Sequence, residues 1–176
     1  MERYARRTSE RAVRRTVASI ALLALIACGS DATSGVMPTP IGVASFVRLV
    51  SDPGDVLGGG ATFDYSKPNA LVTVRPVGAQ LSMRVVGDRV WDGYLALSGD
   101  TRLRTGTFPN LTNTPPLGGA GFRWSSQERT CAASIASVTI DSLTYDGDAL
   151  RAIDLHFEQR CDGQSAALRG QVHWAE

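Results

Sequence analysis

The residues after position 40 predict an all-β domain, which we expect to be a single antiparallel β-sandwich or a barrel-like fold. Apolar residues recur at every second position in many short stretches, as at Leu81, Met83 and Val85, and such alternation buries one face of a strand. Turn-forming residues separate these stretches at intervals of roughly 8–12 residues, which is typical of sandwiches and barrels. No stretch shows the period of a long amphipathic helix.

We expect six strands in the first part of this domain, each bounded by residues that favour turns. They cover residues 45–50, 61–65, 71–75, 81–85, 90–97 and 103–108. The first is followed by Asp52-Pro53-Gly54-Asp55, a turn by composition. In the fifth, Trp91 and Tyr94 are an odd number of positions apart, so a regular strand places them on opposite faces of the sheet.

Residues 109–121 are the longest irregular stretch in the domain, and they include Asn110, Asn113 and two adjacent prolines. A loop of this length in a compact domain is often functional. We therefore expect loop 109–124 to carry a binding surface. Four side chains in it are candidate ligand contacts: Asn110, Asn113, Arg123 and Trp124. Trp124 is singled out because aromatic rings stack against sugars and because it lies just after the irregular part.

The last part of the chain begins with a brief extended segment at 121–124 and continues with strands whose phase changes once. Val138/Ile140 and Leu143/Tyr145 form two apolar pairs in opposite phase, which predicts a bulge or a bend between them. Two turns and two further strands follow: turns at 146–148 and 162–163, and strands at 153–159 and 168–174.

The amino-terminal segment has the pattern of a bacterial export signal. Residues 17–28 form an apolar run of about a dozen residues after a segment with six arginines and two glutamates. A membrane-spanning helix needs roughly 20 apolar residues, whereas a run of 10–14 behind a basic flank is typical of a signal peptide. The alternative is an ordinary buried helix, but the polar residues 29–35 that follow offer nothing to pack against.

Leu25-Ile26-Ala27-Cys28 resembles the lipobox of bacterial lipoprotein precursors. The resemblance implies cleavage before Cys28, a lipid on the Cys28 thiol and acylation of the new amino terminus. Gly29 stands where an Asp would mark retention at the inner membrane, so the resemblance also implies the outer membrane of a double-membraned bacterium. The expected organisation is a signal peptide at 1–27, a lipidated Cys with a flexible linker at 28–40, and a β-domain at 41–176.

The other two cysteines are expected to form a disulfide. If Cys28 carries a lipid, Cys131 and Cys161 remain as an even pair in an exported, oxidising setting. The alternative is a metal site, but neither cysteine has a C-x-x-C or C-x-x-H neighbourhood. We expect no metal ligands among them.

The charge after the predicted cleavage site argues against two classes of partner. Six of the 18 basic residues and two of the 17 acidic residues precede Cys28. That leaves 12 basic and 15 acidic residues, a net charge of −3. Nucleic acids and anionic lipids bind proteins through a basic face, so neither is an expected partner of the domain.

The chain contains no motif of a known enzyme class: no G-x-S-x-G, no H-E-x-x-H, no P-loop and no dinucleotide fingerprint. We therefore predict no catalytic residues and no cofactor. Two alternatives stay open. His156 and Glu158 lie two positions apart on a predicted strand and offer an acid/base pair for a hydrolase. The acidic turns at 52–55 and 146–148 offer oxygens to calcium, although neither matches a calcium-loop pattern.

Several segments are similar to those of an uncharacterised β-domain of secreted bacterial proteins. They are the G-D-V-L-G-G-G run at 54–60, the L-R-T-G-T-F run at 103–108, Cys131, the F-E-Q-R-C-D-G run at 157–163 and the L-R-G run at 168–170. Before the first Cys, that domain has G-R-G where this chain has Glu128-Arg129-Thr130. The resemblance implies the β-fold and the disulfide, and the family has no assigned activity.

From the sequence we expect a lipid-anchored cell-envelope protein whose β-domain is non-catalytic. The expected role is binding or adhesion, to a glycan or to a protein partner, through loop 109–124. A carbohydrate-active hydrolase and a purely structural envelope subunit are the alternatives.

Overall fold

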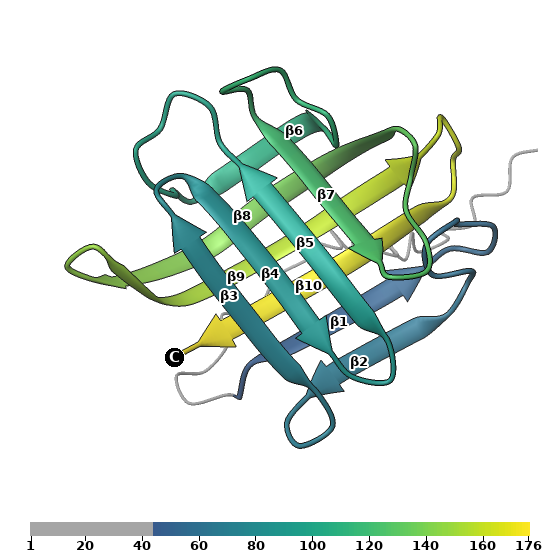
Figure 1. Cartoon of the computed structure of the whole chain (residues 1–176), viewed down its shortest axis with the longest axis horizontal. Coiled ribbons are helices and arrows are strands. Elements are labelled where there is room, and N and C mark those ends of the chain that lie inside the picture. The colour runs from purple at the N-terminus through teal and green to yellow at the C-terminus, as the bar shows by residue number, and fades with distance from the viewer. Residues whose placement is uncertain (1–43) are drawn as a thin grey trace, which may run out of the picture. The chain divides into compact units, whose positions relative to one another are not determined.

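Residues 44–176 are described by a computed structural model, and they form the predicted all-β domain (Figure 1). Its ten strands are β1 (Phe46–Ser51), β2 (Thr62–Ser66), β3 (Leu71–Val77), β4 (Gln80–Val86), β5 (Val90–Ala96), β6 (Gly106–Thr112), β7 (Gly121–Ser126), β8 (Ser134–Asp146), β9 (Ala149–Cys161) and β10 (Ala167–Ala175). This part of the chain contains no helix, and hence none that is long and apolar enough to cross a membrane. The predicted signal peptide, Cys28 and the linker lie outside the described residues.

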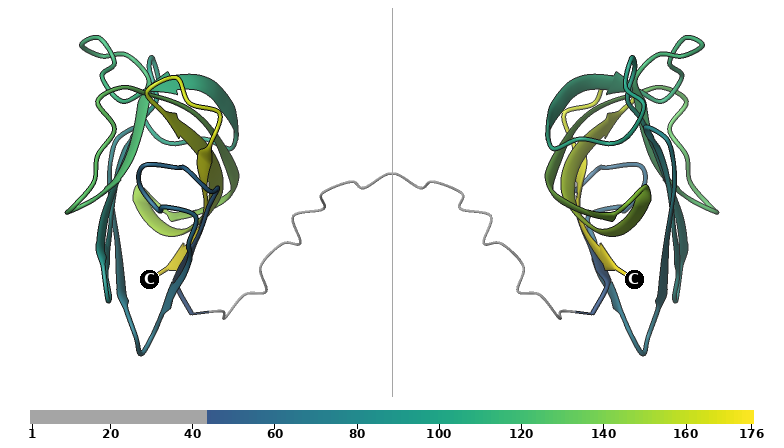
Figure 2. Two further views of the ribbon diagram at one scale, coloured as in Figure 1. Left: turned by 90° about the vertical axis from the view of Figure 1, so that its right-hand side faces the viewer. Right: turned by 90° about the vertical axis from the view of Figure 1, so that its left-hand side faces the viewer.

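The strands form one sheet in the order β2-β1-β10-β9-β8-β6-β7-β5-β4-β3. In Figure 1, β3, β4, β5 and β7 cross over the strands of the other part of the sheet. The side views show these two parts as facing layers (Figure 2). The end strands β2 and β3 also contact one another, so the sheet is nearly closed. The prediction of a sandwich or barrel-like fold is confirmed.

All neighbouring strands are antiparallel except β6 and β7. These two run parallel and meet at one pair of residues, Thr112 and Gly121. Along the rest of β7, the side that faces away from β5 has no neighbouring strand. This weak joint lies where the two layers meet.

The core is built from the inward side chains of both layers. The largest fully buried residues of the β5–β7 layer are Trp91, Phe122 and Trp124. Phe157 of β9 packs between them, with its ring centroid 4.8 Å from that of Phe122 and 5.0 Å from that of Trp124. Tyr94 points outward while Trp91 is fully buried, which confirms that the two lie on opposite faces. Burial of such aromatic side chains supplies a large share of the hydrophobic stabilisation.

The compact unit of the chain that spans Met37–Glu176 contains this core and all ten strands. The two layers therefore pack against one another within this unit. We expect the domain to fold without the residues that precede it, because a domain with its own core is an independent folding unit.

The predicted phase change in the last part of the domain is confirmed as a bulge. β8 is a single strand of 13 residues, and its register against β9 shifts between Ile140 and Ser142. The extra residue, Asp141, re-phases the side chains of the second half of the strand. A two-residue turn, Gly147-Asp148, then leads into β9.

The predicted boundaries around the long loop were wrong in two places. Residues 109–112 are not irregular but belong to β6, and the predicted strand at 103–108 begins only at Gly106. Pro109 cannot donate a backbone hydrogen bond. β6 accommodates it through an irregularity between Phe108 and Leu111, where Asn110 has a φ of 57°. The irregular segment is therefore 113–120.

Candidate functional site

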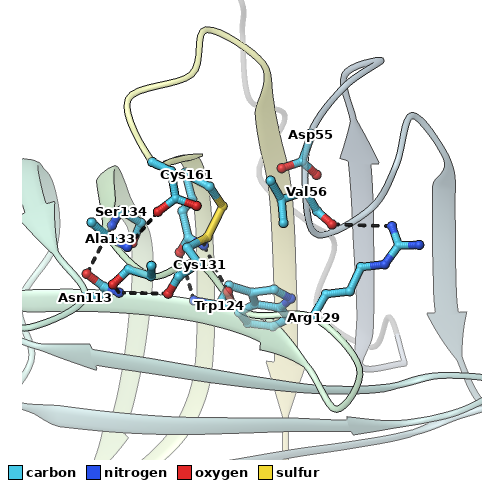
Figure 3. The surroundings of a disulfide bond; sticks show 12 residues. Asp55, Val56, Asn113, Trp124, Arg129, Cys131, Ala133, Ser134 and Cys161 are labelled. Carbon is cyan, nitrogen blue, oxygen red and sulfur yellow. Dashed lines mark hydrogen bonds between the residues drawn. A yellow bond between two sulfur atoms is a disulfide. The ribbon is translucent and has the colours of Figure 1, made fainter.

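The predicted disulfide between Cys131 and Cys161 is present, with Cα atoms 5.2 Å apart (Figure 3). Cys131 follows β7, in one layer, and Cys161 ends β9, in the other. Both are buried. The bond therefore fastens the two layers together next to the weak joint between β6 and β7.

Asn113, a predicted ligand contact, instead holds the chain around this disulfide. Its Oδ1 accepts a hydrogen bond from the Ser134 N–H at 3.1 Å. Its Nδ2 donates to the carbonyl oxygens of Cys131 and Ala132, both at 3.3 Å. Figure 3 shows the Asn113 side chain directed at this backbone. All polar atoms of its amide group are engaged by the fold, so Asn113 has a structural role.

Trp124, the most prominent predicted contact, is not available to a ligand. It is 0% exposed and packs against Phe157 in the core. The reason is strand alternation: in Phe122-Arg123-Trp124 the two aromatic side chains point inward and Arg123 points out. That alternation was visible in the sequence and was the signal that should have placed Trp124 in the core.

Gln159 of β9 supplies the hydrogen bonds that β7 lacks on its unpaired side. Its Oε1 accepts from the Trp124 N–H at 2.8 Å, and its Nε2 donates to the Trp124 carbonyl oxygen at 2.9 Å. This is the pair of bonds that a neighbouring strand would make. Gln159 is itself buried, so the side chain replaces a strand in the interior, where unpaired backbone groups are costly.

The glycine-rich segment 54–60 also has a structural role. Asp55 is buried, and its Oδ2 accepts hydrogen bonds from the Ser51 hydroxyl and the Gly58 N–H, both at 2.8 Å. A Cβ on Gly58 would lie 2.4 Å from the Ser51 Cβ, so only glycine fits there. Arg129 ties this turn to the disulfide by donating to the Val56 carbonyl oxygen at 3.4 Å (Figure 3).

Asp52, in the same acidic turn, is bound to β10. Its Oδ1 pairs with Arg169 at 2.7 Å, and its Oδ2 accepts the Ala167 N–H at 3.1 Å. These hydrogen bonds, the one from Arg169 first, hold the pKa of Asp52 below its usual range. The carboxylate oxygens of Asp52 and Asp55 thus accept hydrogen bonds from different groups of the protein. Within residues 44–176, no three His, Cys, Asp or Glu side chains are grouped as a metal ion would require.

His156 and Glu158, the pair considered for a hydrolase, line a surface cavity of about 480 Å³ on the outer face of β8, β9 and β10. Their side chains are 44% and 31% exposed. The hydrogen bonds of each go to other partners. His156 bonds to Asp141 at 2.9 Å, and Glu158 bonds to Arg169 at 2.8 Å and to Arg160 at 2.5 Å. Arg169 and Arg160 thus hold the Glu158 carboxylate from two sides.

The outer face of β3, β4, β5 and β7 carries a second cavity, of about 530 Å³. One row of cross-strand neighbours there is Arg75, Ser82, Tyr94 and Arg123. The next row is Thr73, Arg84, Asp92 and Ser125. Long and short side chains are thus mixed across this face. We call this cavity the outer groove.

The outer groove carries positive charge that its own residues do not balance. Arg84 is paired with Asp92 at 2.9 Å. Arg75 and Arg123 are exposed, and within residues 44–176 neither forms an ion pair. Tyr94 lies beside Arg123 in the same row. It is the aromatic residue that lines the groove, since Trp91, Phe122 and Trp124 are buried on the other side of this layer.

Loop segment 113–120 extends the outer groove at one end. Residues 115–119 line an adjoining cavity of about 450 Å³ together with Val77 and Tyr94, which also lines the groove. Leu117 is fully exposed and Val77 is 74% exposed. Of the four predicted contacts, only Arg123 lines either cavity. Arg75 and Tyr94 were not among these four contacts, because their position beside Arg123 depends on strand pairing.

The chain matches no protein-family model, no curated protein and no solved structure. The role of the outer groove therefore rests on the side chains that line it.

Proposed function

We propose that this protein is a lipid-anchored cell-envelope protein whose β-domain binds a ligand in the outer groove without catalysis. The observation that carries the proposal is the outward-facing, half-buried Tyr94 in one row with two arginines that have no ion-pair partner within residues 44–176. Small-ligand sites are concave and combine aromatic side chains with a few placed polar groups, and the outer groove offers one aromatic ring among polar and charged side chains.

The anchoring part of the proposal rests on Leu25–Cys28, on the basic flank before the apolar run and on Gly29. A lipid on Cys28 with a second acyl group at the amino terminus would hold the domain stably on a membrane. Mass spectrometry of the mature protein from a double-membraned host tests this. We expect an acylated amino-terminal Cys28 in the outer-membrane fraction, and an unprocessed chain for Cys28→Ser. A mature chain that begins elsewhere would contradict the anchor.

The absence of catalysis is proposed from the arrangement around Glu158. Two guanidinium groups hold this carboxylate, and His156 is bonded to Asp141 rather than to Glu158. A general acid or base must instead be placed to exchange a proton with a substrate. Hydrolysis of a panel of glycans and esters tests the point. Turnover that disappears in Glu158→Gln but not in Asp64→Asn would favour the hydrolase.

A glycan is the ligand that the groove fits best. Tyr94 presents a ring for stacking, and Ser82, Ser125 and the Arg84–Asp92 pair present hydrogen-bonding groups for hydroxyls. The test is an array of cell-wall and environmental glycans probed with the soluble chain 41–176. We expect saturable binding that Tyr94→Ala abolishes. Tyr145→Ala, which removes a partly buried tyrosine outside the groove, is the matched control and should retain binding.

A protein partner is the second candidate, and the adjoining cavity favours it. Leu117 and Val77 expose apolar side chains across that cavity, and exposed apolar surface is where proteins associate. Site-specific cross-linking from position 117 in intact cells tests this. A cross-linked envelope protein that is lost in Val77→Ser would favour the partner over the glycan.

A further inference from the structure

We infer that the ligand of the outer groove is an acidic glycan, a chain of sugars that carry carboxylate groups. This inference rests on the proposed binding function and adds the chemical class of the ligand. It starts from the order of side chains across the layer. From β3 to β7 the row reads Arg75, Ser82, Tyr94, Arg123. A ligand laid across the strands therefore meets a cation, then a ring, then a second cation.

The spacing of the row suits an extended chain of sugars. Neighbouring strands lie about 4.8 Å apart, so the Cα atoms of Arg75 and Arg123 are separated by three such steps, about 14 Å. Tyr94 is one step from Arg123 and two steps from Arg75. A sugar ring stacked on Tyr94 would thus have a guanidinium group on either side. A polymer that carries an acid on each ring offers a carboxylate to both.

The charges of the groove select acidic over neutral sugars. Guanidinium groups bind carboxylates through two parallel charge-assisted hydrogen bonds. Asp92 is the only acidic residue lining the groove, and Arg84 already pairs with it. The guanidinium groups of Arg75 and Arg123 are therefore available to bind a ligand. A neutral glycan would leave both arginines without an acceptor of matching charge.

The lining of the groove also distinguishes a glycan from an acidic peptide. Protein ligands gain most of their affinity from a few large side chains that become buried in well-packed pockets. Among the described residues that line the groove, Tyr94 is the aromatic one, Met83 is buried beneath it on the inner face of the sheet, and the other side chains carry hydroxyl or charged groups. Hydroxyl-bearing and acidic sugars match this pattern. The apolar side chains Val77 and Leu117 line the adjoining cavity instead.

The test measures binding of the soluble chain 41–176 to four polymers by calorimetry. The polymers are polygalacturonate, dextran sulfate, pullulan and poly-L-glutamate, which represent a carboxylated glycan, a sulfated glycan, a neutral glycan and an acidic peptide. The variants are Arg75→Gln, Arg123→Gln and Tyr94→Ala. Arg48→Gln is the matched control, because Arg48 is an exposed arginine on the other layer with the same charge.

We expect polygalacturonate to bind and the other three polymers to bind at least tenfold more weakly. Each arginine variant should weaken that binding by about tenfold, as the loss of one charge-assisted interaction would. Arg48→Gln should leave it unchanged. Thermal unfolding of each variant separates lost binding from lost folding. Preference for dextran sulfate or poly-L-glutamate would overturn the carboxylated glycan as the ligand.

Two further outcomes separate this inference from the function on which it rests. Binding of pullulan that needs Tyr94 but is indifferent to both arginines would overturn the acidic ligand and leave glycan binding in place. No binding of any glycan, here or on the array, would overturn both.

Discussion

The two outer faces of the domain both carry arginines, but they differ in how those arginines are paired. On the face of β1, β9 and β10, charges are matched within the protein: Arg169 pairs with Asp52 and Glu158, and Arg160 pairs with Glu158. On the face of β3, β4, β5 and β7, Arg84 is paired but Arg75 and Arg123 are not. Both faces come from the same alternation of inward and outward residues. What differs is whether the cross-strand neighbour carries the opposite charge.

The comparison teaches that the structural motifs and the unpaired arginines lie in different layers. The segments at 54–60, 157–163 and 168–170 supply Asp55, Gln159, Cys161, Arg169 and Gly170. Each of these has a structural task, such as the 2.1 Å approach of the Phe157 ring to the position of a Cβ on Gly170. The groove residues Arg75 and Tyr94 lie outside those segments. Motifs of this kind therefore predict the fold rather than a ligand.

The largest expected effect comes from cutting the covalent link between the layers. Cys131→Ser with Cys161→Ser should lower the free energy of unfolding by about 3–4 kcal/mol, because the disulfide closes a loop of 30 residues in the unfolded chain. Urea unfolding measures the change, and reduction of the wild-type chain should reproduce it. A loss below about 1 kcal/mol would mean that the layers hold together without the bond.

Removing the side chain that replaces a strand should have the next largest effect. Gln159→Leu leaves the N–H and the carbonyl oxygen of Trp124 buried without partners, which should cost about 3 kcal/mol of stability. Gln171→Leu, on the outer face of β10, is the control and should change stability by less than about 0.5 kcal/mol. Equal effects of the two variants would show that the bonds of Gln159 to β7 contribute little.

Substitution of an arginine should affect stability differently on the two outer faces. Arg75→Gln and Arg123→Gln should each change the free energy of unfolding by less than about 0.5 kcal/mol, because neither residue has a partner to lose within residues 44–176. Arg169→Gln should destabilise the domain measurably, because it leaves Asp52 and Glu158 without their shared cation. Thermal unfolding of the three variants tests this difference between the faces. Destabilisation by Arg75→Gln would contradict it.

The smallest expected effect is a pH dependence of stability that comes from the ion pair between Asp52 and Arg169. The pKa of Asp52 in the folded state lies below its ordinary value of 3.8, mainly because Arg169 donates a hydrogen bond to it. Its contribution to stability is therefore complete above that value and is lost as the pH falls through the lowered pKa. Asp52→Asn should flatten the stability curve in this acid range. An unchanged slope in Asp52→Asn would contradict the assignment.

Local patterns in the sequence predicted most of the fold. The period of two, the turn residues and the bulge near Asp141 depend on neighbours along the chain. The disulfide followed from the number of cysteines and the expected export. The role of Gln159 depends on Trp124, which is 35 residues away in the sequence. No local pattern encodes this pair or the parallel contact between β6 and β7.

The candidate site was predictable only in part. Arg123 was named because it borders the irregular segment, and it does line the groove. Trp124 was misplaced because its closeness to the loop was weighted above the alternation that buries it. Arg75 and Tyr94 join Arg123 through the register of four strands. A row of this kind becomes visible only when the pairing is known.

The bridge from Gln159 to Trp124 also bears on how the domain opens locally. A strand with one unpaired side normally exposes its amides to solvent, and such amides exchange their hydrogens quickly. The Trp124 amide faces the interior and donates to a buried side chain, so it should exchange only when the two layers separate. Its protection against exchange would then report the stability of the whole domain, although β7 lacks a strand along that side.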